Sequence, residues 1–121
     1  MQDLTLLSLE KMLDTATLRH KAIANNLANA NTPGYRRRIV SFDDHLAKAI
    51  AARDPGALRS WRPKVTTSSE AALSPDGNNV SLERELADLM KNSLVYSTCA
   101  QLLSARLAAY KAAISGDSRS A

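Results

Sequence analysis

The sequence predicts an all-α fold in which long N- and C-terminal helices pair as an antiparallel coiled coil, joined by a short irregular middle segment. All four prolines and three of the four glycines lie between residues 33 and 77, so the two flanks are nearly free of helix breakers. Apolar residues make up 45% of the 121 residues but aromatic residues only 4%. A composition rich in Leu and Ala is typical of long helices. Both flanks also repeat their apolar residues at helical spacing.

Residues 1–31 are predicted to form the N-terminal coiled-coil helix. Apolar residues recur there at intervals of three and four, which places them on one helix face. The seam of this helix includes Leu9, Leu13, Ile23 and Leu27.

Residues 32–80 are predicted to be an irregular connecting segment that contains one short helix at residues 43–53. In that helix Leu46 and Ile50 lie one turn apart. We expect the Asp-Pro-Gly sequence at residues 54–56 to end it. Later in the segment, residues 60–69 (SWRPKVTTSS) are compatible with a short β stretch, and Ser-Pro-Asp-Gly at residues 74–77 indicates a turn.

Residues 81–116 are predicted to form the C-terminal coiled-coil helix, followed by a tail at residues 117–121. Ser81 is suited to cap the helix N-terminus, where Glu83 and Glu85 complement the helix dipole. Apolar residues repeat every 3.5 residues on average, which is the period of a coiled coil. The predicted seam comprises Leu82, Leu86, Leu89, Tyr96, Leu103, Leu107, Tyr110 and Ile114.

The stretch ANNLANANTPGYRRR, residues 24–38, is unusual because asparagine is a poor residue for a helix interior. At 100° per residue, Asn25 and Asn29 fall opposite the seam and Asn26 lies on its flank. Two interpretations remain open. The amides form a hydrogen-bonding face for a neighbouring backbone, or they belong to a frayed, solvated helix end.

The residues that follow predict a tight turn. Asn31 can adopt a left-handed conformation at the helix end. Pro33 restricts Thr32 to extended backbone, and Gly34 can adopt a positive φ. Tyr35 then has an apolar ring and a polar tip with which to anchor the turn.

Several functional classes have no support in the residues. A single cysteine, Cys99, excludes an internal disulfide framework. The two histidines have no metal-ligand spacing, and no nucleophile–base set is present. We therefore expect no catalytic residues, no cofactor, no metal and no small-molecule substrate. The N-terminus does not resemble a cleaved signal peptide, and no apolar run is long enough to span a membrane.

The net charge of +4 comes from the middle of the chain, because the remaining residues are slightly acidic in sum. Residues 36–64 contain eight Lys or Arg and three Asp, and Trp61 lies among them. A small basic helical nucleic-acid-binding module is therefore one alternative function, although the basic residues follow no helix face. A helical adaptor protein is another.

The sequence also resembles a known family. Residues 24–35 are similar to the N-terminal signature of bacterial flagellar rod, hook and hook-associated axial proteins, N-N-(I/L)-A-N-x-x-T-P-G-(Y/F). The matching residues are Asn25, Asn26, Leu27, Ala28, Asn29, Thr32, Pro33, Gly34 and Tyr35. With Asn31, these residues form the assembly motif that the resemblance implies.

The resemblance extends to the C-terminal helix and points to the proximal rod. Residues 76–96 (DGNNVSLERELADLMKNSLVY) look like the D-G-N-x-V-x-x-x-x-E…N-x-x-x-Y run of one proximal rod protein. A sister proximal rod protein, which tends to a Pro-Asn-Val-Asn entry, is the alternative within the family. With only about 50 residues between the helices, the chain has no room for the large inserts of distal rod or hook proteins.

The resemblance implies a structural subunit that self-assembles with other rod proteins into the helical drive shaft of the flagellum. Its expected partners are itself, other rod subunits, and the MS-ring and export-gate side of the basal body. The type III export apparatus would carry it, without a cleaved signal peptide, to the rod in the periplasmic space. No nucleic acid and no membrane span are expected.

Overall fold

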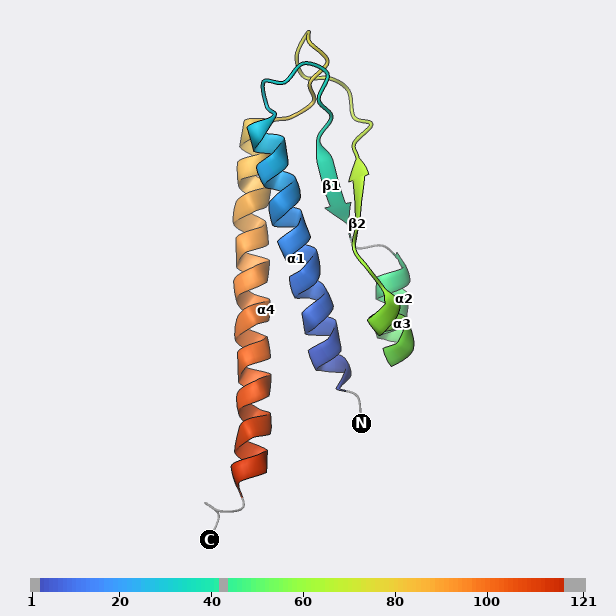
Figure 1. Cartoon of the computed structure of the whole chain (residues 1–121), viewed down its shortest axis with the longest axis vertical. Helices are drawn as coiled ribbons and strands as arrows, with labels where there is room; N and C mark the ends of the chain where they lie inside the picture. The colour runs from blue at the N-terminus through green and yellow to red at the C-terminus, as the bar shows by residue number, and fades with distance from the viewer. Residues whose placement is uncertain (1–2, 42–43, 117–121) are drawn as a thin grey trace.

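The structure is a computed structural model that describes residues 3–41 and 44–116. Helices α1 (Leu4–Ala28) and α4 (Leu82–Gly116) lie side by side and run in opposite directions (Figure 1). The chain between them forms strand β1 (Arg38–Ser41), helices α2 (Asp44–Ala51) and α3 (Pro55–Ser60), and strand β2 (Lys64–Thr67). The prediction of a mainly helical chain with long helices at both ends is confirmed. Residues 1–2, Asp43 and the predicted tail at 117–121 lie outside the described residues.

The elements follow one another in space in the order α4, α1, β1 and β2 (Figure 1). Helix α1 is therefore covered by α4 on one side and by the β-ribbon on the other. Strands β1 and β2 form an antiparallel ribbon in which Arg38 is opposite Thr67 and Ser41 is opposite Lys64. The short β stretch expected within residues 60–69 is thus confirmed as β2. Its partner β1 was not predicted, because Arg-Ile-Val-Ser is too short to show a clear alternation.

Helices α2 and α3 form a small lobe beside the N-terminal half of α1. Its buried core consists of Leu46, Ala49, Leu58 and Trp61, against which Leu4, Leu7 and Ala57 pack. The buried side chain of Lys11 donates hydrogen bonds from Nζ to the carbonyl oxygens of Arg59 (3.1 Å) and Trp61 (3.0 Å). A cation suits this position, since the last carbonyls of a helix carry partial negative charge.

Helix α2 ends before residues 54–56, as expected, but these residues also begin a second helix that was not predicted. The carboxylate of Asp54 accepts a hydrogen bond from the backbone N–H of Ala57 (3.1 Å), and Pro55 is the first residue of α3. An Asp N-cap followed by Pro at the first helical position is a helix start. The same three residues therefore separate α2 from α3 and begin the second helix.

Asp3 joins the beginning of α1 to the far part of α4. Its carboxylate caps α1 by accepting hydrogen bonds from the N–H groups of Thr5 and Leu6. It also accepts hydrogen bonds from Arg106 Nε (3.0 Å) and from the hydroxyl of Tyr110. The bonds from Arg106 and Tyr110 hold the pKa of Asp3 well below the ordinary range of an aspartate.

This lowered pKa predicts a pH-dependent contact. A carboxyl whose pKa is depressed by folding contributes stability above its unfolded pKa of about 3.9, and loses it as the pH falls through the folded value. Asparagine caps a helix as well as aspartate but carries no charge. We therefore expect Asp3→Asn to lower the urea midpoint at neutral pH, with the gap to the native chain closing in acid. An equal gap at both pH values would show that the ion pair with Arg106 contributes nothing.

Candidate assembly site

Six polar residues converge where the C-terminal end of α1 meets the first turns of α4, and we call this cluster the polar junction. Four chain segments contribute to it: α1, the turn after α1, the turn before α4, and α4 itself. The members are Asn26, Tyr35, Arg37, Asn78, Asn79 and Glu85.

Asn26 is the centre of the polar junction and is fully buried. Its Oδ1 accepts hydrogen bonds from the backbone N–H of Arg38 (2.8 Å) and the hydroxyl of Tyr35 (3.0 Å). Its Nδ2 donates to the carbonyl of Arg38 (2.9 Å) and to Glu85 Oε2 (3.1 Å). All four hydrogen-bonding positions of the amide are thus occupied within the chain.

Arg37 forms a buried ion pair across the polar junction. Its Nε lies 2.8 Å from Glu85 Oε1, and the Glu85 side chain is 0% exposed. Its Nη2 reaches Asp88 Oδ2 at 3.2 Å, and Asp88 is partly exposed. The arginine that the sequence presents as part of a basic surface run is therefore neutralised inside the protein.

The turn after α1 and the turn before α4 contact each other through hydrogen bonds from an asparagine side chain and through two glycines. Asn78 Nδ2 donates to the carbonyls of Asn29 and Thr32, both at 2.8 Å. Gly34 N–H donates to the carbonyl of Asp76 at 2.9 Å. Gly34 and Gly77 both have positive φ, and a Cβ on Gly77 would lie 3.5 Å from the Gly34 Cα. The positive φ expected for Gly34 is confirmed, and the turn expected at residues 74–77 is present.

The structure places the predicted assembly motif in two different environments. Asn26 is buried and Tyr35 is half-buried, whereas Asn25 and the turn residues Asn31 to Gly34 are exposed. Asn29 serves the end of its own helix, because its Nδ2 donates to the Asn25 carbonyl and its Oδ1 accepts from the Thr32 hydroxyl. Leu27 is half-buried and Ala28 is exposed.

Asn31 does not adopt the left-handed conformation that its residue type allows. Within residues 3–41 and 44–116, Arg53 is the only non-glycine residue with a positive φ. Helix α1 instead ends at Ala28, where Asn29 caps it, and the chain continues in turns to Gly34. Because Gly34 takes the positive φ, Asn31 has no need to adopt it.

None of the buried residues of α4 is among the predicted apolar seam residues. The buried residues of α4 are Glu85, Asn92 and Cys99, seven residues apart. Asn92 Nδ2 donates to the carbonyl of Ala16 in α1 at 2.7 Å. Burial raises the pKa of the Cys99 thiol, in keeping with a packing role.

The predicted seam residues of α4 are mostly uncovered in the single chain. Leu89 and Leu103 are half-buried, and the exposed ones are Leu82, Leu86, Tyr96, Leu107, Tyr110 and Ile114. The predicted seam residues of α1 are more buried than those of α4: Leu9 and Ile23 are buried and Leu13 is half-buried. The exposed part of the α4 seam is therefore available for contacts outside the single chain.

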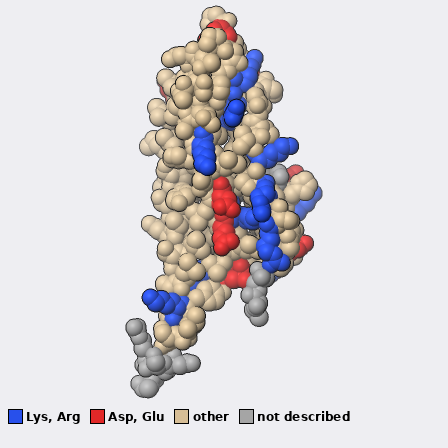
Figure 2. Space-filling view, in the orientation of Figure 1, with Lys and Arg blue, Asp and Glu red and all other residues tan. Residues whose placement is uncertain are grey.

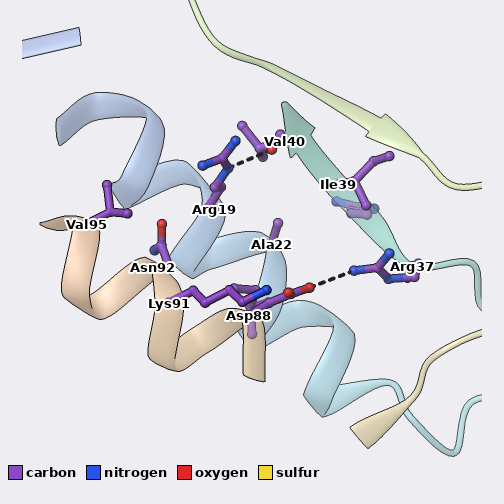
Figure 3. Close-up of a pocket in the computed structure, with 11 residues that line it drawn as sticks. Arg19, Ala22, Arg37, Ile39, Val40, Asp88, Lys91, Asn92 and Val95 are labelled. Atoms are coloured by element: carbon purple, nitrogen blue, oxygen red, sulfur yellow. Dashed lines mark hydrogen bonds and ion pairs between the residues drawn. The ribbon is translucent and has the colours of Figure 1, made fainter. Parts of the chain in front are cut away.

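A hollow of about 230 Å³ lies beside the polar junction, between α1, α4 and β1 (Figure 3). Three of its charged residues are engaged with the chain: Arg37 pairs with Asp88, and Arg19 Nε donates to the carbonyl of Val40 at 2.8 Å. In the part of the chain that the structure describes, no cluster of His, Cys, Asp or Glu could hold a metal ion. The chemistry here is hydrogen bonding and charge pairing between segments, which fixes how β1 and α4 are held against α1.

Sequence reasoning missed most of this junction. It identified the asparagine stretch and the Ser-Pro-Asp-Gly turn as separate motifs, but not that the two regions meet in space. The available signal was the pairing of two polar, glycine-containing turns at the facing ends of two helices.

None of the described helices is long and apolar enough to cross a membrane.

Known proteins that are similar to this chain are flagellar rod proteins. A family described as flagella basal body rod protein matches residues 13–36, which include most of the asparagine stretch. The flagellar basal body rod protein FlgB of Aquifex aeolicus is 33% identical over 93 residues, covering 74% of this chain and 75% of that protein. FlgB of Bacillus subtilis is 25% identical over 122 residues, covering 93% and 94% respectively.

A third relative, FlgB of Aeromonas hydrophila, is 28% identical over 117 residues and covers 87% of this chain and 88% of its own. The matches to the Bacillus and Aeromonas proteins cover most of the chain. They give no support to the sister proximal rod protein, to a nucleic-acid-binding module or to an adaptor. The chain belongs to the family of the flagellar basal body rod protein FlgB.

Proposed function

We propose that this chain is a non-catalytic building block of the proximal rod, which assembles with itself and other rod subunits into a helical drive shaft that transmits motor torque. The observation that carries the proposal is the uncovered apolar surface of α4 in a chain that belongs to a rod family. Large apolar side chains on one element of a soluble chain indicate a protein interface. The exposed ones on α4 are Leu82, Leu86, Met90, Leu94, Tyr96, Leu102, Leu107, Tyr110 and Ile114.

The α1–α4 pair is the structural core of this subunit, and we propose that it acts as an antiparallel coiled coil. Hydrogen bonds and ion pairs near both ends and the middle, such as Glu85 with Asn26 and Arg106 with Asp3, support this alignment. The predicted seam of α4 then faces neighbouring subunits, which supply the knobs or holes that α1 does not. A contact between two different surfaces of identical subunits propagates along a helix when its rotation does not close into a ring.

The proposed location is the rod within the periplasmic space, between the MS-ring and export gate on one side and the rest of the rod on the other. The chain would reach it through the flagellar type III export apparatus, without cleavage of a signal peptide. Family membership supports the basal body as the location, and the specific neighbours are part of the proposal. In this arrangement the assembly motif at residues 25–35 holds each subunit in the shape that its neighbours bind.

A charged pair of substitutions on the exposed face of α4 tests the function. Leu86 and Leu94 are 52% and 69% exposed, so Leu86→Glu with Leu94→Glu should leave the single chain folded. Burying two unpaired carboxylates at a subunit interface would cost several kcal/mol, so we expect no completed rod and no swimming. Electron microscopy of basal bodies and soft-agar motility are the measurements.

The matched control is Leu73→Glu, a leucine 66% exposed that lies outside α4. We expect that variant to swim normally. Normal rods in cells carrying both α4 substitutions would show that the exposed leucines are not an interface and would remove the main support for the proposal.

A further inference from the structure

The outer edge of β2 is uncovered in this chain. Strand β2 lies on the far side of β1 from both long helices, and no element covers it in Figure 1. All four of its residues, Lys64–Thr67, are exposed. Two-stranded ribbons are only marginally stable on their own, and an open strand edge is a template for another strand.

The register shows which backbone groups point outward. Ser68 N–H donates to the carbonyl of Arg37 at 2.8 Å, so these two residues form a hydrogen-bonded pair. Because such pairs alternate along an antiparallel ladder, Lys64 and Thr66 face β1, and the backbone groups of Val65 and Thr67 face away from it. Within residues 3–41 and 44–116, nothing pairs with these outward groups.

The opposite edge of the ribbon is treated differently. The outward N–H and carbonyl of Arg38 in β1 are both bonded by the amide of Asn26, and the carbonyl of Val40 accepts from Arg19 Nε. Side chains of α1 therefore take the place of a neighbouring strand along β1. The contrast leaves β2 as the edge of the ribbon that still has hydrogen-bonding capacity.

Charge indicates what kind of strand fits there. Exposed Arg62 and Lys64 lie at one end of β2, and Arg38 stands directly across from Thr67 at the other. Figure 2 shows most of the visible Lys and Arg side chains over the strands and the α2–α3 lobe. Two β2 strands placed side by side would bring their basic ends into one ribbon and repel each other. An acidic strand would instead be attracted.

We propose that the outer edge of β2 binds an extended, acidic segment of a neighbouring subunit, which adds a third strand to the ribbon. Its backbone pairs with the outward groups of Val65 and Thr67, and its Asp or Glu side chains lie on the face of the ribbon that carries Arg62 and Lys64. That the segment comes from another subunit rests on the proposed rod function. The free edge and its charge do not.

Proline substitutions separate the outer edge from the inner one. Proline has no N–H and is tolerated on an edge strand where that N–H faces outward. Val65→Pro and Thr67→Pro therefore remove donors from the outer edge only, whereas Thr66→Pro removes one that bonds β1. We expect the first two purified chains to keep the native urea midpoint and helix content, and Thr66→Pro to lower the midpoint.

A peptide probe tests binding without any need for rod assembly. The probe is fluorescein-labelled Thr-Glu-Val-Glu-Val-Glu-Thr, compared with the same peptide carrying Lys in place of Glu, and the measurement is fluorescence anisotropy with the full chain. We expect only the acidic peptide to bind, and Val65→Pro to weaken it about tenfold, as for one lost hydrogen bond. Equal binding of both peptides, or unchanged binding to Val65→Pro, would overturn the proposal. So would a native chain that dimerises when Val65→Pro does not, because the occupant would then be a second copy.

Motility distinguishes this proposal from the proposed function. Cells carrying Val65→Pro or Thr67→Pro should fail to complete rods, as should cells with the Leu86 and Leu94 substitutions. Normal swimming of the proline variants alone would contradict the strand-binding proposal but not the proposed rod function. Normal swimming of the leucine variant as well would remove both.

Discussion

Replacing Arg37 by methionine is expected to lower the free energy of unfolding by about 3–5 kcal/mol. Arg37 is buried, and Glu85 beside it is 0% exposed at a distance of 2.8 Å. Without the guanidinium, Glu85 keeps a single hydrogen bond from Asn26 but loses its counter-charge in a site that water does not reach. The measurement is the urea midpoint of the helical circular dichroism signal.

The ion pair predicts an asymmetry between its two members. Glu85→Gln should cost less than Arg37→Met, because Arg37 still contacts Asp88 at 3.2 Å and Asp88 is partly exposed to water. Arg37→Met combined with Glu85→Met should also be more stable than Arg37→Met alone, since replacing a buried pair with apolar residues removes the unpaired charge. Additive losses in this cycle would show that the two side chains do not act as a pair.

Replacing Asn26 by aspartate is expected to destabilise the chain by about 3 kcal/mol or more, although the two side chains have the same shape. The amide nitrogen donates to the carbonyl of Arg38 and to Glu85, and a carboxylate oxygen there would repel both acceptors. Each buried group left unsatisfied costs about 1–3 kcal/mol, and the new charge is 3.1 Å from where Glu85 accepts. Protonation of the introduced carboxyl should restore part of the stability as the pH falls.

The neighbouring asparagine gives a matched control. Asn25 is exposed and directly precedes Asn26 in α1. We expect Asn25→Asp to change the free energy of unfolding by less than about 0.5 kcal/mol, as for other surface substitutions. Urea unfolding measures this change. Similar losses at both positions would mean that the aspartate acts through helix propensity and not through the polar junction.

Local signals in the sequence determined where the elements lie. A flank without proline or glycine and with regular apolar spacing is helical in almost any context, and the structure has α1 and α4 in the two flanks. The turn at Gly34 was predictable because Thr-Pro-Gly restricts the backbone within three residues. The Asp-Pro pair before α3 carried an equally local signal, which also has a second meaning as a helix start.

Only the tertiary structure decided which polar residues are buried and which apolar residues are not. Asn26, Arg37 and Glu85 look like surface residues in sequence, because their type is usually exposed. Each is buried through partners at least nine residues away, and Arg37 and Glu85 are 48 positions apart. Burial of a charge or amide is favourable only when every partner is in place, so no local pattern reveals it. The apolar stripe of α4 was visible in the sequence, but the face that meets α1 was fixed by these distant hydrogen bonds, which leave the stripe exposed.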